Sequence, residues 1–390
     1  MALADVSLVS AGVRLARCRS CGESELERVL DLGLQPVADW LVEPGAPPES
    51  EARYPLVLTF CRRCVLLQLA PFAEEERVRG HEHSGALSST VGEHDAAWAR
   101  EMGSRLGLSP ASVVVDAEGG GKGVAHALDR LGIRVVAPTD CRPLSADLVI
   151  ANHSLAHALD LGRAAGDLIG LLAEDGTVAI EFHHAARLLV DTQFDLICHP
   201  HRTYLSVAAV VMAFARHGLV SVDADEIPVH GGSVRLYARR GKGLPGPTVE
   251  RLMAAEGAVG LGDRSHHRGL ARRVQVASTA VRGFLEQARA ERRTVLGYGA
   301  PSRASTLLNH CGVTTDLLPA TVDRSPSKQG LALPGCRVPI HAPALLADVK
   351  PDYVLILAWT LAEEIMEQLP EVRSWGGRFV TPLPDVKVLP

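Results

Sequence analysis

Three histidines follow a stretch of the chain that has the composition of a buried strand. The segment Glu181–Ser206 reads EFHHAARLLVDTQFDLICHPHRTYLS and places His184, His199 and His201 just beyond its apolar residues. A neutral imidazole, with an unperturbed pKa near ~6.5, removes protons at neutral pH, and general-base catalysis contributes about 10²–10⁴-fold. This loop is therefore the first candidate for a catalytic site.

The residues alone leave two other interpretations of these histidines open. Histidines at a sheet edge often only satisfy backbone groups. Pro200 lacks an N–H and biases His199 towards extended backbone, so it reshapes the loop around His201. Imidazoles also bind transition metals, although the spacing here matches no specific ligand motif. That metal site would draw on six histidines: His81, His83, His183, His184, His199 and His201.

Four of the eight cysteines form two Cys-x-x-Cys pairs, Cys18 with Cys21 and Cys61 with Cys64. Each pair can present two sulfurs on one tight turn, and four thiolates close a tetrahedral zinc site that has no open position for water. Disulfide or redox use is the alternative, which a reducing compartment disfavours. We predict structural zinc, with a strand-loop excursion between the two pairs.

Length and charge limit the class of protein. A chain of 390 residues is too long for one ordinary core and predicts two or three domains. With 22% charged residues and a net charge of −5, it has no basic field for nucleic acid or an anionic membrane. Its start lacks a continuous apolar stretch, and no run is long enough to span a bilayer, so we expect a cytoplasmic protein.

The middle of the chain alternates short apolar runs with helical patterns, which predicts a parallel sheet with flanking helices. The run Asp116–Gly123, DAEGGGKG, joins the first expected strand to a helix that begins near Val124. Glycines let a backbone approach a ligand, and the start of a helix offers N–H groups. This pattern suits a nucleotide-like cofactor, although an ordinary turn would have the same pattern. The stretches 219–228 and 233–240 predict a closing antiparallel hairpin.

A second α/β unit follows the Gly- and Pro-rich stretch 241–247. There a strand leads through Gly297 and Gly299 to Arg303 at the start of a helix, which suits phosphate binding or a plain turn. Further apolar strands that end near Asp323 and Trp359 favour a Rossmann-like sheet whose loops converge at its carboxyl edge.

Motifs along most of the chain resemble three-domain sugar C-methyltransferases, enzymes of deoxysugar biosynthesis that methylate a keto-sugar nucleotide. They include ANHSLAHALDL, EFHHAARL, HPHRTYLS, HGGSVRLYA, VDRSPSKQG and WGGRFV. The chain departs from the family where Cys198-His-Pro-His201 replaces Tyr-His-Glu-His, and where its glycine turn lacks Asn-Asp-Gly. The resemblance implies an α/β protein with an N-terminal zinc-binding domain, a class I methyltransferase-like (Rossmann-like) middle domain and a second, C-terminal Rossmann-like domain.

The resemblance also implies residue roles. His201 matches the family's base, His184 would donate to the developing oxyanion, Tyr204 stands at a polar active-site position, and His199 supports them. Residues implied around S-adenosylmethionine are Asp116, Gly119, Gly121, Gly123, Thr139, Asp140, Asn152 and His157. Residues implied to hold the nucleotide-sugar are Gly297, Gly299, Arg303, Asp323 and Lys328.

We therefore predict three domains, residues 1–78, 79–240 and 241–390, with zinc in the first, S-adenosylmethionine in the second and a nucleotide-diphosphate sugar held by the third. The predicted activity is C-methylation of a keto-deoxysugar nucleotide in secondary-metabolite (antibiotic) sugar biosynthesis, through His-assisted α-deprotonation and an enolate. Two alternatives remain: a keto-sugar epimerase or isomerase without methyl transfer, and a non-catalytic partner-binding homologue.

Overall fold

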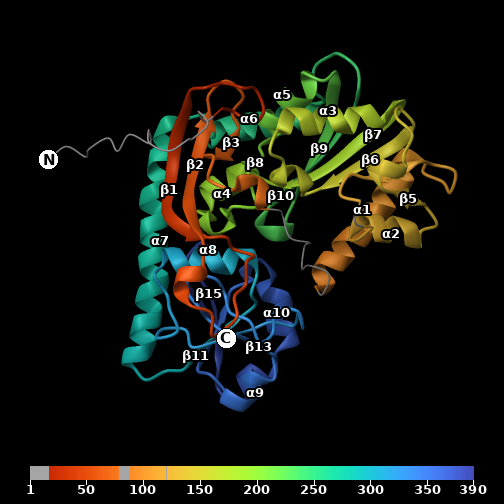
Figure 1. Cartoon of the computed structure of the whole chain (residues 1–390). Helices are drawn as coiled ribbons and strands as arrows, with labels where there is room; N and C mark the ends of the chain where they lie inside the picture. Colours follow the sequence, from red (N-terminus) through yellow and green to blue (C-terminus); the bar gives the residue numbers. More distant parts are fainter. Residues whose placement is uncertain (1–16, 79–87, 120) are drawn as a thin grey trace.

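The computed structural model describes residues 17–78, 88–119 and 121–390, which contain three sheets. Figure 1 shows the N-terminal strands in red and orange beside the yellow and green middle sheet, with the blue C-terminal sheet below both. Helices cover the middle and C-terminal sheets. This arrangement confirms the predicted α/β fold class.

The N-terminal sheet is antiparallel throughout and has the order β1-β2-β3-β8. Its strands are β1 (Leu26–Pro36), β2 (Arg53–Cys61), β3 (Leu67–Leu69) and β8 (Thr203–Tyr204). The strand-loop excursion expected between the cysteine pairs consists of β1 and β2. Strand β8 belongs to the histidine segment, with Tyr204 opposite Leu67. The sheet thus crosses the expected boundary after residue 78, and the domain limits stay a prediction.

The middle sheet has the order β5-β4-β6-β7-β10-β9. Strands β4 to β7 run parallel, and β10 lies antiparallel between β7 and β9. The bounds are β4 (Val114–Asp116), β5 (Val135–Val136), β6 (Ala146–Asn152), β7 (Leu172–His183), β9 (Leu219–Ile227) and β10 (Ser233–Arg240). The predicted closing hairpin is confirmed, and an antiparallel strand in this position is typical of a methyltransferase sheet.

The C-terminal sheet has the order β13-β12-β11-β14-β15-β16, and only the pairing of β16 is antiparallel. Its strands are β11 (Val295–Tyr298), β12 (Thr321–Val322), β13 (Ile340–His341), β14 (Tyr353–Ile356), β15 (Arg378–Thr381) and β16 (Lys387–Leu389). Parallel strands joined by crossovers bring the loops after β11, β12 and β14 to one edge. The predicted Rossmann-like unit is confirmed.

Side-chain caps explain where several helices begin. Asp160, Ser206 and Asp263 accept backbone N–H groups at the starts of α3, α5 and α7, which satisfies donors that have no partner inside a helix. The helices of the middle part are α1 (Ser89–Leu106), α2 (Val124–Arg130), α3 (Leu161–Leu171), α4 (Ala185–Val190) and α5 (Val207–Ala215). Those that follow are α6 (Pro247–Ala258), α7 (Arg264–Ala290), α8 (Ser302–His310), α9 (Leu345–Val349), α10 (Ala362–Gln368) and α11 (Glu371–Ser374).

Shared cores join the three parts. One apolar cluster runs from β1 and β2 through α4 and α7 to the C-terminal sheet, and another joins Cys18, Cys61 and Cys64 to the middle sheet. The long helix α7 lies alongside β1 and extends towards the C-terminal sheet (Figure 1). Across the described ranges, no helix has the length and apolar character that a membrane span requires.

Candidate active site

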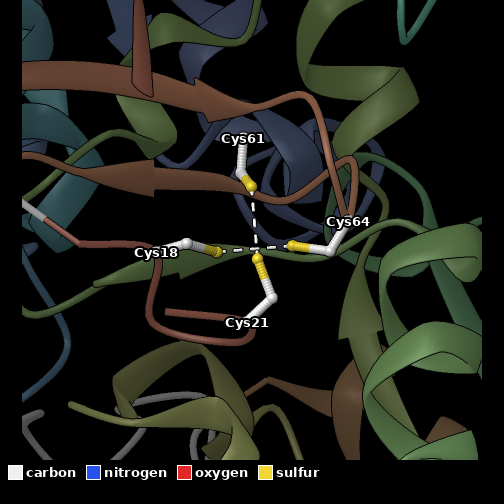
Figure 2. A group of neighbouring side chains, drawn as sticks. All are labelled: Cys18, Cys21, Cys61 and Cys64. Atoms are coloured by element: carbon white, nitrogen blue, oxygen red, sulfur yellow. Dashed lines mark hydrogen bonds between the residues drawn. The ribbon is translucent and has the colours of Figure 1, made fainter. Parts of the chain in front are cut away.

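Four thiols from two turns converge on one point (Figure 2). Their Sγ atoms all lie within 4.8 Å of one another, with 3.3 Å between Cys18 and Cys64 and 3.5 Å between Cys21 and Cys61. Tetrahedral zinc with Zn–S bonds of about 2.3 Å requires sulfurs roughly 3.8 Å apart. The four predicted ligands fit such an ion, and all four cysteines are free of disulfides.

Burial makes this centre a structural one. Cys18, Cys61 and Cys64 are buried and Cys21 is half-buried. The hydrogen bond with Cys64 lowers the pKa of Cys18 to about 5, whereas burial raises the pKa of Cys61 to about 11. A divalent cation would stabilise all four as thiolates, because a bound metal favours the deprotonated form of its ligands. Four protein ligands leave no position for a reacting water.

The glycine turn after β4 is organised by a carboxylate. Asp116 accepts the backbone N–H of Glu118 at 3.1 Å and that of Gly121 at 3.2 Å. Gly119, Gly121 and Gly123 have φ values of 70°, 59° and 57°, where glycine is favoured because it has no Cβ. These four of the predicted cofactor residues therefore form one turn, in which Asp116 holds the backbone in place.

Two further side chains adjoin this turn. A Cβ built on Gly123 would lie 3.3 Å from Oδ2 of Asp95 and 3.9 Å from Nδ2 of Asn152. The Oδ1 atom of Asn152 is buried without a hydrogen-bond partner. Buried polar atoms normally have partners, so this oxygen is available to accept a hydrogen bond from a ligand or a water. Burial raises the pKa of Asp95 to about 6. Asp95 was not predicted, because its stretch carried no pattern beyond polarity.

Thr139 and Asp140 lie at the same edge of the sheet. Both are exposed in the short helix Pro138–Asp140 after β5, the strand beside β4. A Cβ on Gly119 would contact Cβ of Ala137 at 3.5 Å, so the two turns adjoin. The structure thus brings Thr139 and Asp140 beside the glycine turn.

His201 lines a small cavity of about 10 Å³, which is room for one water. Its Nδ1 lies 3.2 Å from the carbonyl oxygen of Leu196. A carbonyl only accepts, so Nδ1 donates there and the lone pair resides on Nε2, which is the tautomer that a base requires. The other lining residues are Ala156, Phe182, His183, Ala185, Leu188, Leu196, Thr203, Tyr204 and Leu205.

Tyr204 and His199 support this loop through backbone contacts. The hydroxyl of Tyr204 accepts the N–H of Cys198 at 3.2 Å, and burial raises the pKa of Tyr204 well above its usual range. Nε2 of His199 lies 3.3 Å from the carbonyl oxygen of Tyr54, and burial lowers the pKa of His199 to about 4. His199 therefore ties the loop to the N-terminal sheet, as its expected supporting role requires.

His184 contacts a buried carboxylate. Its Nε2 lies 2.7 Å from Oε1 of Glu256 on α6, and the same carboxylate accepts the N–H groups of Val207 and Ala208 at 2.6 and 3.0 Å. Among the described residues that line the cavity of His201, His184 does not occur. Its expected role as an oxyanion donor stays a prediction, while its observed contact joins α6 to the start of α5.

His157, expected at the cofactor, lies beside His201, and its role at the cofactor stays a prediction. Its Nδ1 lies 2.9 Å from the carbonyl oxygen of Pro200, and its ring centroid is 5.1 Å from that of His201. His183 adjoins His201 on the other side at 6.0 Å. His183 was named among the ligands of the alternative metal site and not as a catalytic residue, and the buried His153, 4.4 Å from it, was not predicted. The only signal for His153 was its occurrence in a motif of the resemblance.

The two glycines of the C-terminal turn serve close packing. A Cβ on Gly297 would lie 2.6 Å from Oγ1 of Thr321, and a Cβ on Gly299 would lie 3.1 Å from Cβ of Ala358. The contact at Gly297 is too short for a side chain, and Gly299 has φ = 93°, so both positions favour glycine whether or not a ligand binds. Their predicted contact with substrate stays a prediction.

Asp323 and Lys328 meet at the same turn. Oδ2 of Asp323 accepts the N–H of Ala300 at 2.7 Å, and Nζ of Lys328 donates to the carbonyl oxygen of Ala300 at 2.9 Å. The ammonium and the carboxylate are 3.9 Å apart. These predicted substrate residues thus come together at the carboxyl edge of the sheet.

Arg303 reaches from α8 to the middle part of the chain. Its guanidinium donates to the carbonyl oxygen of His230 at 2.9 Å and lies 3.6 Å from Oδ2 of Asp195. Trp359 donates to the same oxygen of Asp195 at 2.7 Å, and the guanidinium stacks over its ring. Burial raises the pKa of Asp195. Arg303 is thus a cation at the junction of the middle and C-terminal parts.

The strand order, the four-cysteine centre and the histidine loop define a methyltransferase with an N-terminal zinc-binding part. Two family models agree: one for a zinc binding domain matches residues 18–78, and one for the C-methyltransferase C-terminal domain matches residues 228–384. The chain is 30% identical over 406 aligned positions to the C-methyltransferase NovU of Streptomyces niveus, covering 95% of this chain and 96% of NovU. The chain belongs to this C-methyltransferase family.

Solved structures are more distant. The 1,6-didemethyltoxoflavin-N1-methyltransferase of Burkholderia thailandensis is 15% identical and has a TM-score of 0.31, covering 45% of this chain and 96% of its own. Its overlap is confined to part of this chain, so the class I fold is defined here by the strand order.

The alternative metal site finds no support within residues 17–78, 88–119 and 121–390. There, the four cysteines are the only group of three or more histidine, cysteine or acidic residues whose ligand atoms lie close enough for one ion. His81 and His83 lie outside the described residues.

Proposed function

We propose that this protein is an S-adenosylmethionine-dependent C-methyltransferase that acts on a keto-deoxysugar nucleotide, with His201 as the base. The observation that carries the proposal is the position of His201. Its ring lies on a cavity beside the carboxyl end of β7, with Nδ1 bound to the carbonyl of Leu196 and the lone pair on Nε2. Methylating a carbon next to a ketone requires such a base to remove the α-proton.

The turn after β4 suits S-adenosylmethionine, which supplies an electrophilic methyl group when bound. Gly119, Gly121 and Gly123 let the ligand approach the backbone, and Oδ1 of Asn152 offers a buried acceptor without a protein partner. Asp95 adds a carboxylate beside Gly123. An ammonium group, as in the amino-acid part of the cofactor, would satisfy both oxygens. Thr139 and Asp140 then adjoin the ribose.

The C-terminal part suits the nucleotide-sugar. Arg303 places a guanidinium at the carbonyl of His230 and near His183 of the cavity, and its Nη1 is buried without a hydrogen-bond partner. Lys328 adds a second cation at the edge of the same sheet. Guanidinium groups bind phosphate oxygens in a planar, bidentate manner, so a diphosphate matches Arg303. The substrate would lie between the middle and C-terminal parts, with its ketone towards His201.

Substrate entry requires the surroundings of His201 to open, because about 10 Å³ holds one water and no sugar ring. Glu364 on α10 fastens the C-terminal part to the start of α1. It accepts the hydroxyl of Ser88 at 2.6 Å and the N–H groups of Ser89 and Thr90 at 3.2 and 3.0 Å, at the start of α1. Loss of these contacts would free α1 from the C-terminal part, and their return would enclose the substrate, as closing elements do in many enzymes.

Isothermal titration of the zinc-loaded protein with S-adenosylmethionine tests the proposal. We expect saturable binding that Asn152→Leu weakens, because Leu has nearly the shape of Asn and lacks the acceptor oxygen. Absence of binding by the folded protein would exclude methyl transfer. A donor-free reaction in D₂O with a nucleoside diphosphate 4-keto-6-deoxyhexose then separates the alternatives. Exchange without S-adenosylmethionine binding would indicate an epimerase or isomerase, and absence of both would favour a non-catalytic homologue.

A further inference from the structure

A second histidine shares the cavity with His201. His183 is the last residue of β7 and lines the cavity, and its ring centroid lies 6.0 Å from that of His201. The remaining lining residues contribute mainly apolar surface. Two imidazoles that line one small cavity therefore adjoin the position that a reacting group must occupy.

Buried groups pack beside the ring of His183. His153 lies 4.4 Å from it, centroid to centroid, and is only 4% exposed. The N–H of His153 donates to the carbonyl oxygen of Glu181 at 2.7 Å, and its Nε2 lies 3.5 Å from Oε1 of the same residue. Glu181 is 1% exposed and also contacts His94 at 2.8 Å and Arg235 at 3.2 Å. This network fixes His153, which in turn limits where the ring of His183 can lie.

Two residues beside the ring of His183 have a strained backbone. His153 and His230 both have φ = 60°, a conformation that costs energy for residues other than glycine. Their rings lie 4.4 and 5.7 Å from that of His183. Such strain persists only where surrounding contacts enforce it, and it gathers at functional sites. The rings of both strained residues lie beside the imidazole of His183.

The surroundings also keep His183 neutral. Burial lowers the pKa of His183 well below its ordinary value, and the nearby His153, Arg303, His230 and His201 lower it further. A neutral imidazole still donates one hydrogen bond. Because the groups around it are cationic or can become so, negative charge that develops beside His183 is stabilised, whereas positive charge is not.

We infer that His183 is a second catalytic residue, which donates a hydrogen bond to the ketone oxygen of the substrate, and that His153 and Glu181 position it. This inference rests on the proposed function. When His201 removes the α-proton, the C–H bond breaks and the proton moves to Nε2. The electron pair of that bond forms the C=C bond of the enolate, and the carbonyl π pair moves to the oxygen. The N–H of His183 then bonds an oxygen that carries a full charge, and such bonds are strongest there.

The neighbouring histidine is less suited to this task. Nε2 of His184 lies 2.7 Å from Oε1 of Glu256, and that carboxylate is itself buried. His183 ends β7 and His184 follows it at the start of α4, and the contacts of the two side chains differ. His183 faces the cavity and His184 faces α6.

The test compares two replacements of similar length in the full-length, zinc-loaded protein. His183→Gln keeps an N–H donor and His183→Met removes it. Deuterium exchange into a nucleoside diphosphate 4-keto-6-deoxyhexose, without S-adenosylmethionine, reports enolate formation alone. We expect His183→Met to slow exchange about 10²–10³-fold, as loss of one oxyanion donor does, and His183→Gln to stay within about 10-fold of wild type. His126→Met, at an exposed histidine of α2, is the matched control.

The outcomes separate the inference from the proposed function. Equal exchange rates in His183→Met and His183→Gln would overturn the inference. The proposed function would stand in that case if the wild-type protein transfers a methyl group. No exchange and no methylation by wild type would overturn both. If His183→Met does not fold, His153→Asn serves instead: we expect several-fold slower exchange with an unchanged dissociation constant for S-adenosylmethionine. An unaltered exchange rate in that variant would overturn the positioning role.

Discussion

The zinc centre and the histidine cavity concentrate side chains of one type in contrasting ways. The cysteines come from two short motifs, and their sulfurs lie within 4.8 Å of one another. The histidines come from the ends of β6, β7 and β8 and from the loops beside them, with ring centroids 4.4 to 6.0 Å apart. The four sulfurs converge on one point, whereas the imidazole rings lie around a small cavity.

Under the proposed function, this difference separates a site that stabilises the fold from a site that performs the reaction. Four thiolates around one ion leave no room for a substrate, and three of these cysteines join the core of the middle sheet. Carbonyl oxygens and a carboxylate of the middle part orient these histidine rings, which therefore need no metal ion to hold them. A defect should therefore reduce stability at the first site and the rate at the second.

Zinc removal should have the largest effect. Structural zinc contributes about 10–16 kcal/mol of apparent binding energy in small zinc-finger peptides, so Cys64→Ser should lower the melting temperature by more than about 10 °C. Thermal unfolding followed by circular dichroism, with the zinc content measured, checks this. Cys141→Ser, at a cysteine outside the centre, is the control and should unfold like wild type. Equal melting temperatures for the two variants would contradict a structural metal.

His201→Gln should reduce the rate of methyl transfer about 10²–10⁴-fold, because a general base contributes that much. Its melting temperature should change little, since the ring is only partly buried. His199→Gln should show the reverse: reduced stability with most of the rate retained, because His199 is fully buried against the N-terminal sheet. Steady-state kinetics and thermal unfolding of both variants decide it. A rate loss in His199→Gln as large as that in His201→Gln would remove the distinction.

Affinity for S-adenosylmethionine should fall about 10-fold between pH 7 and pH 5. Burial raises the pKa of Asp95 to about 6, so its carboxylate becomes protonated in this range and loses its attraction for an ammonium group. The free energy of unfolding should change in the opposite direction. The pKa of Asp95 is higher in the folded state than in the unfolded state, so the cost of its buried charge disappears, and stability rises, as the pH falls through 6. Titration calorimetry across this range checks it, and Asp95→Asn should flatten the profile. An identical profile in Asp95→Asn would contradict this role.

Glu364→Gln should have the smallest effect, a loss of about 1 kcal/mol in the free energy of unfolding, because hydrogen bonds to a charged group are replaced by neutral ones. Burial acts to raise the pKa of Glu364, but hydrogen bonds from Ser88 and Thr90 bring it to about 2, so the carboxylate is charged at neutral pH. Urea unfolding and the KM for the substrate check this, with the exposed Glu367→Gln as control. Unchanged values in Glu364→Gln would show that this contact does not fasten α1.

Local patterns account for the expectations that were confirmed. Cys-x-x-Cys spacing predicts a zinc turn because both sulfurs come from a few consecutive residues. Alternating apolar runs and helical patterns predict parallel strands, and the two late strands predict the hairpin of β9 and β10. The glycine turn of Asp116 is also local, since its carboxylate bonds N–H groups two and five residues ahead.

Long-range contacts account for what the sequence left undecided. Nothing local shows that His184 contacts Glu256, which lies on α6, or that His157 lies beside His201. The same holds for Asp95, which reaches Gly123 only because α1 packs beside α2.

By itself, the sequence determined the zinc ligands, the strand and helix pattern, and the loop that carries His201, because each depends on residues close together in the chain. Only the tertiary structure decided which imidazoles share a cavity and which are bound by carboxylates. Those choices depend on how β7, α1 and α6 pack, and packing joins residues that no spacing in the chain relates.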